Sequence, residues 1–242
     1  MTTAELVVVG AAVFLAGMVQ IVSGFGFGLL SVPLMTLAIP TRDAVVVSTL
    51  LGAGVSLSQA WYQRAHRQRV LVRRLTIAAY VGMPLGLWVF VVVDDHVLRL
   101  MLGIAVLISV GLLAARVNLR HSGPALDAGA GFVSGVLNTS LSTNGPPLVF
   151  VLQARHLEPD EFRGTISMVF ALSNIAGIGL FIAAGKIHVN GLVAAAVALP
   201  ALGAGQLAGY PLRRHVHGER FRWMVLALLV VAAASAMISA FT

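Results

Sequence analysis

The residues that could do chemistry inside this chain are neutral and polar, and they gather in two segments rich in glycine or proline. Residues 23–28 carry glycine at every second position, and residues 138–147 combine amide and hydroxyl side chains with a final Gly-Pro-Pro. Glycine, proline and short polar side chains all interrupt the hydrogen bonding of a helix. Each segment therefore predicts a helix that breaks and restarts. The restart presents unpaired N–H groups and the positive end of its dipole, which favour an anion.

Charged chemistry is missing from the same stretches. All nine acidic residues and all seven histidines lie at or near the ends of apolar runs, and the chain has no cysteine. We therefore predict no catalytic residue, metal or cofactor, and we expect substrate contacts from the neutral groups near the two breaks. Helix packing explains Phe25 and Phe27 equally well, and hydrogen bonding between helices explains Ser48 and Ser167. The expected substrate-binding residues are Gln20, Ser23, Gly24, Phe25, Gly26, Phe27, Ser48, Asn138, Thr139, Ser142, Thr143, Asn144, Gly145, Pro146 and Ser167.

The elements that must position these residues are membrane helices. Of the 242 residues, 58% are hydrophobic and only 10% are charged, whereas soluble domains carry about 25% charged residues. Charged residues divide the chain into eight apolar runs, and six of these have about the length of one bilayer crossing. The first run is too long for one crossing, and the fifth contains the second break. The runs are 6–41, 44–63, 75–93, 100–115, 128–154, 164–185, 189–212 and 223–242.

The two halves of the chain share one order of elements, a long broken run followed by three ordinary runs. An offset of 118 or 119 residues aligns Gly17 with Gly135 and Pro40 with Pro159. We therefore expect two repeats, residues 1–118 and 119–242, within one membrane domain.

Loop charges predict how the repeats are oriented. If each broken run is a hairpin that enters and leaves on one side, thirteen Lys and Arg residues fall on one side and three on the other, whereas eight simple crossings divide them equally. The positive-inside rule favours the hairpins and a cytoplasmic basic side, which should contact anionic lipid headgroups and not nucleic acid. The predicted fold class is an all-α integral membrane protein with two inverted repeats. Each repeat is a re-entrant or broken helical hairpin followed by three transmembrane helices, as in many secondary transporters.

The broken segments also resemble a known family. GMVQIVSGFGFGLLSVP at residues 17–33 and its weaker partner GVLNTSLSTNGPPLVFVL at residues 135–152 resemble the TauE/SafE family of sulfite exporter-like permeases. The resemblance covers essentially the whole chain. It implies a multi-pass permease of the bacterial inner membrane that exports sulfite, sulfoacetate, related sulfonates or other small organic anions. Asn144 departs from the pattern, since such proteins often have another glycine before Gly-Pro-Pro.

We therefore expect a permease, not an enzyme, that exports a small anion through a midplane site between the two hairpins. The interior-negative membrane potential drives anion efflux by about 2.3 kcal/mol per charge per 100 mV, so export requires no coupling ion. Two alternatives belong to other classes. One is a permease for a metal ion or a neutral solute, and the other is a membrane enzyme that acts on a phosphate or lipid headgroup with His156, Glu158 and Arg163.

Overall fold

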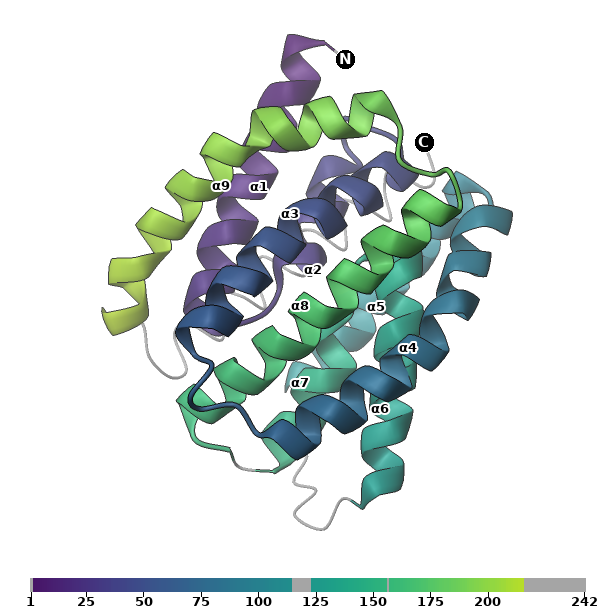
Figure 1. Ribbon diagram of the computed structural model, residues 1–242. Helices are drawn as coiled ribbons and strands as arrows, with labels where there is room; N and C mark the ends of the chain where they lie inside the picture. The colour runs from purple at the N-terminus through teal and green to yellow at the C-terminus, as the bar shows by residue number, and fades with distance from the viewer. Residues whose placement is uncertain (1, 115–122, 156, 216–242) are drawn as a thin grey trace.

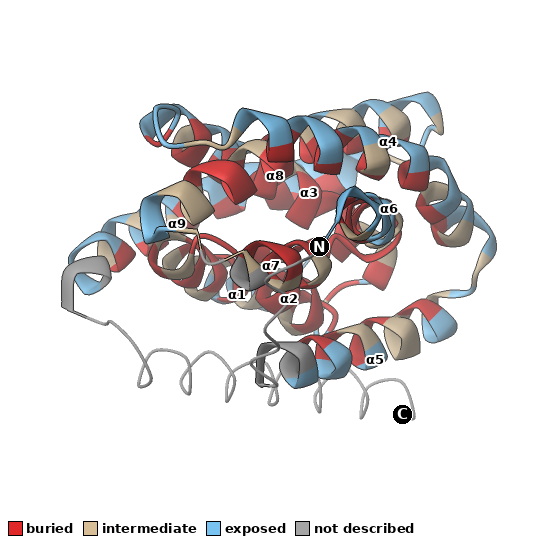
Figure 2. Cartoon of the chain, turned by 90° about the horizontal axis from the view of Figure 1, so that it is seen from below, coloured by how far each residue is buried: buried red, intermediate tan, exposed pale blue. Residues whose placement is uncertain are grey.

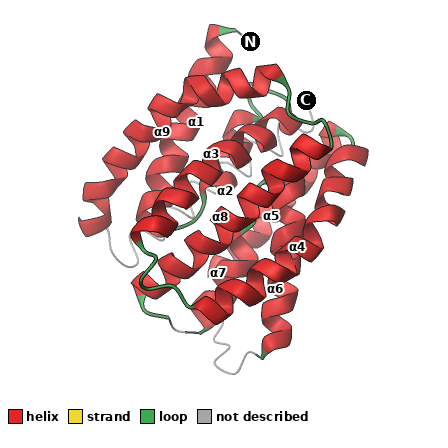
Figure 3. Ribbon diagram, viewed as in Figure 1, coloured by secondary structure: helices red, strands yellow, loops and turns green. Residues whose placement is uncertain are grey.

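A computed structural model of the chain describes residues 2–114, 123–155 and 157–215, and this part contains nine α-helices and no strand (Figures 1 and 3). The all-α prediction is therefore confirmed for these residues. The predicted run 223–242, the basic residues beyond position 215 and His156 lie outside the described residues. The helices are α1 (Thr3–Ser23), α2 (Phe27–Met35), α3 (Thr41–Tyr62), α4 (Arg69–Val92), α5 (Asp95–Ala114), α6 (Pro124–Leu141), α7 (Gly145–Ala154), α8 (Pro159–Ala183) and α9 (Val189–His215).

Five of the described helices, α1, α3, α4, α8 and α9, are long and apolar enough to cross a membrane. Large apolar side chains remain exposed on outward faces, for example Trp88 on α4, Ile104 on α5 and Leu207 on α9. Figure 2 shows these outer faces around a buried centre that contains α2 and α7. Exposed apolar surface of this extent marks a membrane-facing protein.

The helix breaks that the sequence predicts are present. Between α1 and α2, Gly24 and Gly26 have φ angles of 85° and 101°, which glycine adopts without the clash of a Cβ. Between α6 and α7, Ser142 has a φ of 54°, a left-handed conformation that is uncommon for a residue with a side chain. Pro146 and Pro147 lie in the first turn of α7, where a missing backbone N–H leaves no hydrogen bond unmade.

One end of the molecule gathers the start of α4, the start of α6, the end of α7 and the start of α8. Asp127 in α6 pairs with Arg155, directly after α7, at 2.6 Å and with Arg74 in α4 at 3.7 Å. Gln68 donates a hydrogen bond of 2.6 Å to Glu161 in α8. Asp127 is fully buried, which its position at the end of an apolar run did not predict.

The opposite end gathers the starts of α3, α5 and α9 and the end of α4. Asp95 accepts hydrogen bonds from the hydroxyl of Thr41 at 3.0 Å and from the backbone N–H of Arg42 at 3.3 Å. Asp95 also accepts from the backbone N–H of Thr41 at 3.4 Å, so its carboxylate satisfies two N–H groups that the first turn of α3 leaves without a helical partner. Glu5 in α1 and Pro40 after α2 line one pocket with the start of α9, so the start of α1 and the end of α2 lie at this same end.

Three helix pairs make the most extensive contacts, α1 with α9, α4 with α6, and α3 with α8 (Figure 1). The short helices lie inside this frame, with α2 against α1 and α3, and α7 against α5, α6 and α8. The two breaks are thereby brought to the interior of the bundle.

Candidate substrate site

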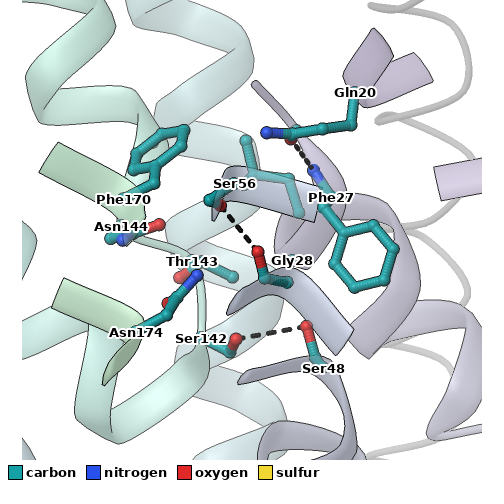
Figure 4. Close-up of a pocket in the computed structure, with 14 residues that line it drawn as sticks. Gln20, Phe27, Gly28, Ser48, Ser56, Ser142, Thr143, Asn144, Phe170 and Asn174 are labelled. Carbon is teal, nitrogen blue, oxygen red and sulfur yellow. Dashed lines mark hydrogen bonds between the residues drawn. The ribbon is translucent and has the colours of Figure 1, made fainter. Parts of the chain in front are cut away.

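The two breaks meet at a small pocket (Figure 4). Its void is about 340 Å³, counting the part that is open to solvent. A Cβ at Gly28 would lie only 1.7 Å from the carbonyl oxygen of Ser142, so the start of α2 touches the second break backbone to backbone. The lining residues are Gln20, Gly26, Phe27, Gly28, Leu29, Ser48, Gly52, Ser56, Ser142, Thr143, Asn144, Gly145, Phe170 and Asn174.

The pocket is polar but neutral. None of its described lining residues is acidic, basic or histidine. Within the described ranges, no group of three or more histidines and acidic residues could hold a metal ion. The pocket can therefore bind a solute through hydrogen bonds from amides, hydroxyls and backbone N–H groups, and through the dipoles of two helix starts.

The first break is largely satisfied by its own neighbours. The side-chain oxygen of Gln20 accepts a hydrogen bond of 3.0 Å from the backbone N–H of Phe27, at the start of α2. The amide nitrogen of Gln20 donates to Gln59 at 3.2 Å, and Gln59 donates back to the carbonyl oxygen of Gln20 at 3.0 Å. The Gln20 amide thus occupies one of the first-turn donors of α2. Among the described residues, the next two N–H groups, of Gly28 and Leu29, have no hydrogen-bond partner.

A chain of hydroxyls ties the second break to α2 and α3. The Oγ of Ser48 is 2.9 Å from the Oγ of Ser31 and accepts a hydrogen bond of 3.1 Å from Ser142. Thr49 donates to the Oγ of Ser142 at 3.2 Å. Because Ser142 has positive φ, these contacts help to hold a conformation that is otherwise unfavourable for a non-glycine residue.

The second break contains two of the buried polar groups that lack hydrogen-bond partners among the described residues. Thr143 and Asn144 are 1% and 8% exposed, and among the described residues no group bonds to the Oγ1 of Thr143 or the Nδ2 of Asn144. The main chain is nonetheless anchored, since Ser134 donates to the carbonyl oxygen of Asn144 at 2.9 Å. A buried donor without a partner costs about 1–3 kcal/mol, and an acceptor that reached these two groups would offset this cost.

Eight of the fifteen residues predicted to bind substrate line the pocket, and seven do not. The structure gives several of the seven other partners. Thr139 donates to the carbonyl oxygen of Met83 at 2.7 Å and so joins α6 to α4. Ser167 donates to Gln59 at 3.4 Å, which fits the alternative of a bond between helices. The residues outside the lining are Ser23, Gly24, Phe25, Asn138, Thr139, Pro146 and Ser167.

Two of these residues pack at the edge of the site. Phe25 contacts Phe162 edge to face, with ring centroids 6.5 Å apart. A Cβ at Gly24 would lie 3.1 Å from the side chain of Arg163, whose guanidinium donates to the carbonyl oxygen of Val22 at 3.4 Å. Arg163 thus covers the first break from α8.

Four pocket residues of α3 and α8 were not among the substrate-binding residues that the sequence predicted. Gly52 and Ser56 follow Ser48 at intervals of four residues, and Phe170 and Asn174 are also four residues apart. Residues with this spacing lie on one face of a helix. Extending the prediction from Ser48 along its own helical face would have found the α3 residues.

Comparisons with known proteins identify the family of the chain. The family model for sulfite exporter TauE/SafE matches residues 9–236. The probable inner membrane transporter protein TsaS of Comamonas testosteroni is 30% identical over 164 residues, which cover 64% of this chain and 66%, just under two thirds, of that protein. No solved structure matches the chain. Because the family model spans nearly the whole sequence, the chain belongs to the sulfite exporter TauE/SafE family.

Proposed function

We propose that this protein exports a small oxyanion, sulfite or an organic sulfonate such as sulfoacetate, across the bacterial inner membrane through the pocket between the two breaks. The family description supports sulfite as a cargo, and the name of the relative TsaS supports an inner-membrane location. The observation that carries the proposal is the pair of buried donors without partners, on Thr143 and Asn144, beside two helix starts.

The chemistry of the pocket favours an anion over a cation. Four lining residues carry hydrogen-bond donors that have no partner among the described residues. These donors are the backbone N–H groups of Gly28 and Leu29 and the side chains of Thr143 and Asn144. The oxygens of a sulfite or sulfonate group can accept hydrogen bonds from both breaks at once, and a hydrogen bond to a charged group contributes about 1.5–3 kcal/mol. A cation would meet the positive ends of two helix dipoles. The described lining residues include no basic side chain. The bound anion therefore forms no ion pair that would have to break before the anion is released.

The two breaks contribute unequally to this proposed site. The first break supplies backbone N–H groups, while Gln20 occupies the donor of Phe27. The second break supplies side-chain donors, because Pro146 and Pro147 have no N–H to offer. We therefore assign the choice of anion chiefly to Thr143 and Asn144.

The architecture we propose for the membrane domain is a pair of inverted repeats, residues 1–118 and 119–242. Its support is the symmetry of the helix contacts. If the repeats are equivalent, α1 corresponds to α6, α3 to α8 and α4 to α9. The contact of α1 with α9 then corresponds to that of α6 with α4, and the contact of α4 with α8 to that of α9 with α3. The contact of α3 with α8 corresponds to itself, and all of these contacts are present. A twofold relation between repeats produces this correspondence.

Each broken run in this proposal is a re-entrant hairpin. Support comes from contacts between hairpin ends, namely the ion pair of Asp127 with Arg155 in the second and the shared pocket of Glu5 and Pro40 in the first. The described basic residues of the α3–α4 and α7–α8 connections belong to one end of the molecule, which we assign to the cytoplasm. The two breaks then face each other near the bilayer midplane, and the membrane potential drives the anion outward.

The test is flux through the purified protein in liposomes loaded with sulfite or sulfoacetate. We expect saturable efflux that grows with an imposed potential, negative on the loaded side. Asn144→Leu should raise the apparent KM about 10- to 100-fold, the equivalent of one charge-assisted hydrogen bond. Asn190→Leu, the same change at an exposed position of α9, should leave flux unchanged. Flux of a divalent cation or a neutral solute, without flux of either anion, would contradict the proposal.

A further inference from the structure

A second cavity lies on the outside of the bundle, between α4 and α6, and the substrate site shares no residue with it. It is an open groove with a void of about 1120 Å³, counting the part that is open to solvent. Arg73 and Arg74 lie at one end, and apolar side chains from both helices, among them Ile77, Val81 and Phe132, line the rest.

The charge of the groove is positive and largely uncompensated. Arg73 is exposed, and no hydrogen bond or ion pair is found for it within the described residues. Arg74 is 44% exposed and reaches Asp127 only at 3.7 Å, while Asp127 makes its short contact of 2.6 Å with Arg155. No acidic residue is among the described residues that line the groove. An anionic group would therefore be attracted to this end.

The order of residues along the groove matches the order of parts in a phospholipid. Ile77 and Val81 follow Arg73 at intervals of four residues, so they lie one and two turns further along the same face of α4. At about 1.5 Å per residue, Val81 is about 12 Å from Arg73 along the helix axis. Ile77, Val81 and Phe132 are 57%, 65% and 38% exposed. The arginines belong to the end that we assign to the cytoplasmic headgroups, and the apolar side chains run from there toward the bilayer core.

We propose that this groove binds one anionic phospholipid, with its phosphate at Arg73 and Arg74 and an acyl chain along Ile77, Val81 and Phe132. Arginine forms paired hydrogen bonds with phosphate, and the apolar wall covers the chain. A zwitterionic lipid brings a cationic group as well as the phosphate, so the groove should prefer a headgroup with net negative charge. The inference does not depend on which solute the protein carries.

The experiment measures lipid binding to the purified full chain in detergent by native mass spectrometry. Phosphatidylglycerol should bind at least ten-fold more tightly than phosphatidylcholine with the same acyl chains. Arg73→Gln should lower the affinity for phosphatidylglycerol at least five-fold. Arg64→Gln, at an exposed arginine that follows α3 and does not line the groove, should change it less than two-fold.

A second variant separates the acyl-chain contact from the headgroup contact. Ile77→Ser should weaken both lipids together without changing their ratio. Three results would each overturn the proposal. The two lipids bind equally, Arg73→Gln leaves the affinity for phosphatidylglycerol unchanged, or the protein retains neither lipid. Displacement of the lipid by millimolar glycerol phosphate would also overturn it, because the groove would then be a site for a free phosphate compound.

Discussion

Gly28→Ala is the most direct test of whether the two breaks touch. The added Cβ would lie 1.7 Å from the carbonyl oxygen of Ser142, whereas real Cβ atoms essentially never come closer than 3.0 Å to such a group. The start of α2 and the second break would therefore have to separate by about 1.3 Å or more. Backbone cannot rotate out of the way as a side chain can, so we expect a loss of about 3 kcal/mol, the upper part of the usual range for overpacking.

The control for this variant is Gly54→Ala in α3, where a Cβ would meet nothing within 4 Å. Alanine is a better helix former than glycine by about 1 kcal/mol, so the control should be neutral or stabilising. In thermal unfolding of the purified protein, Gly28→Ala should lower the midpoint by roughly 6–12 °C and abolish sulfite flux in liposomes. If both variants unfold at the wild-type temperature and both transport sulfite, the breaks do not meet and the reasoning about the pocket is wrong.

Single cysteines in place of Ala65 and Asn190, both exposed, should react with an impermeant maleimide from opposite sides of the membrane. Labelling of both from one side would fit eight simple crossings and contradict the hairpins. Asp127→Asn removes the buried ion pair with Arg155 and should lower the free energy of unfolding by about 3 kcal/mol in denaturant titrations. Adding Arg155→Gln should recover part of this loss, and a purely additive double variant would refute the coupling. Gln20→Glu keeps an oxygen at the start of α2 but brings a carboxylate into the pocket, so sulfite flux should fall at least ten-fold. Wild-type flux in that variant would argue against an anion bound beside α2.

The helical architecture was predictable because apolar runs and helix breakers act locally. The glycines at 24 and 26 and the Gly-Pro-Pro at 145–147 fall at the two breaks. Helix starts were less predictable. α4 begins at Arg69 and α8 at Pro159, several residues before the apolar runs at 75 and 164. Charged residues end an apolar run but do not end a helix, and acidic residues even stabilise its first turn.

The site was predictable only as far as the breaks themselves. Residues within them, such as Gly26 and Asn144, line the pocket, because a helix that breaks inside a bundle exposes polar groups there. Which hydroxyls face the pocket depends on helix rotation, which the sequence leaves undetermined. Ser48 lines it, while Thr139 bonds to the backbone of α4. The burial of Asp127 between Arg74 and Arg155 likewise depends on three helix ends meeting, which no local pattern encodes.

The backbone of the second break is fastened independently of the side chains at positions 143 and 144. Ser134 holds the carbonyl group of Asn144, and Ser142 is tied to Ser48. Substitutions of the side chains at 143 and 144 should therefore leave these two bonds of the loop in place. Under the function proposed above, a change of cargo would then begin with replacements in this loop and leave the surrounding helices as they are.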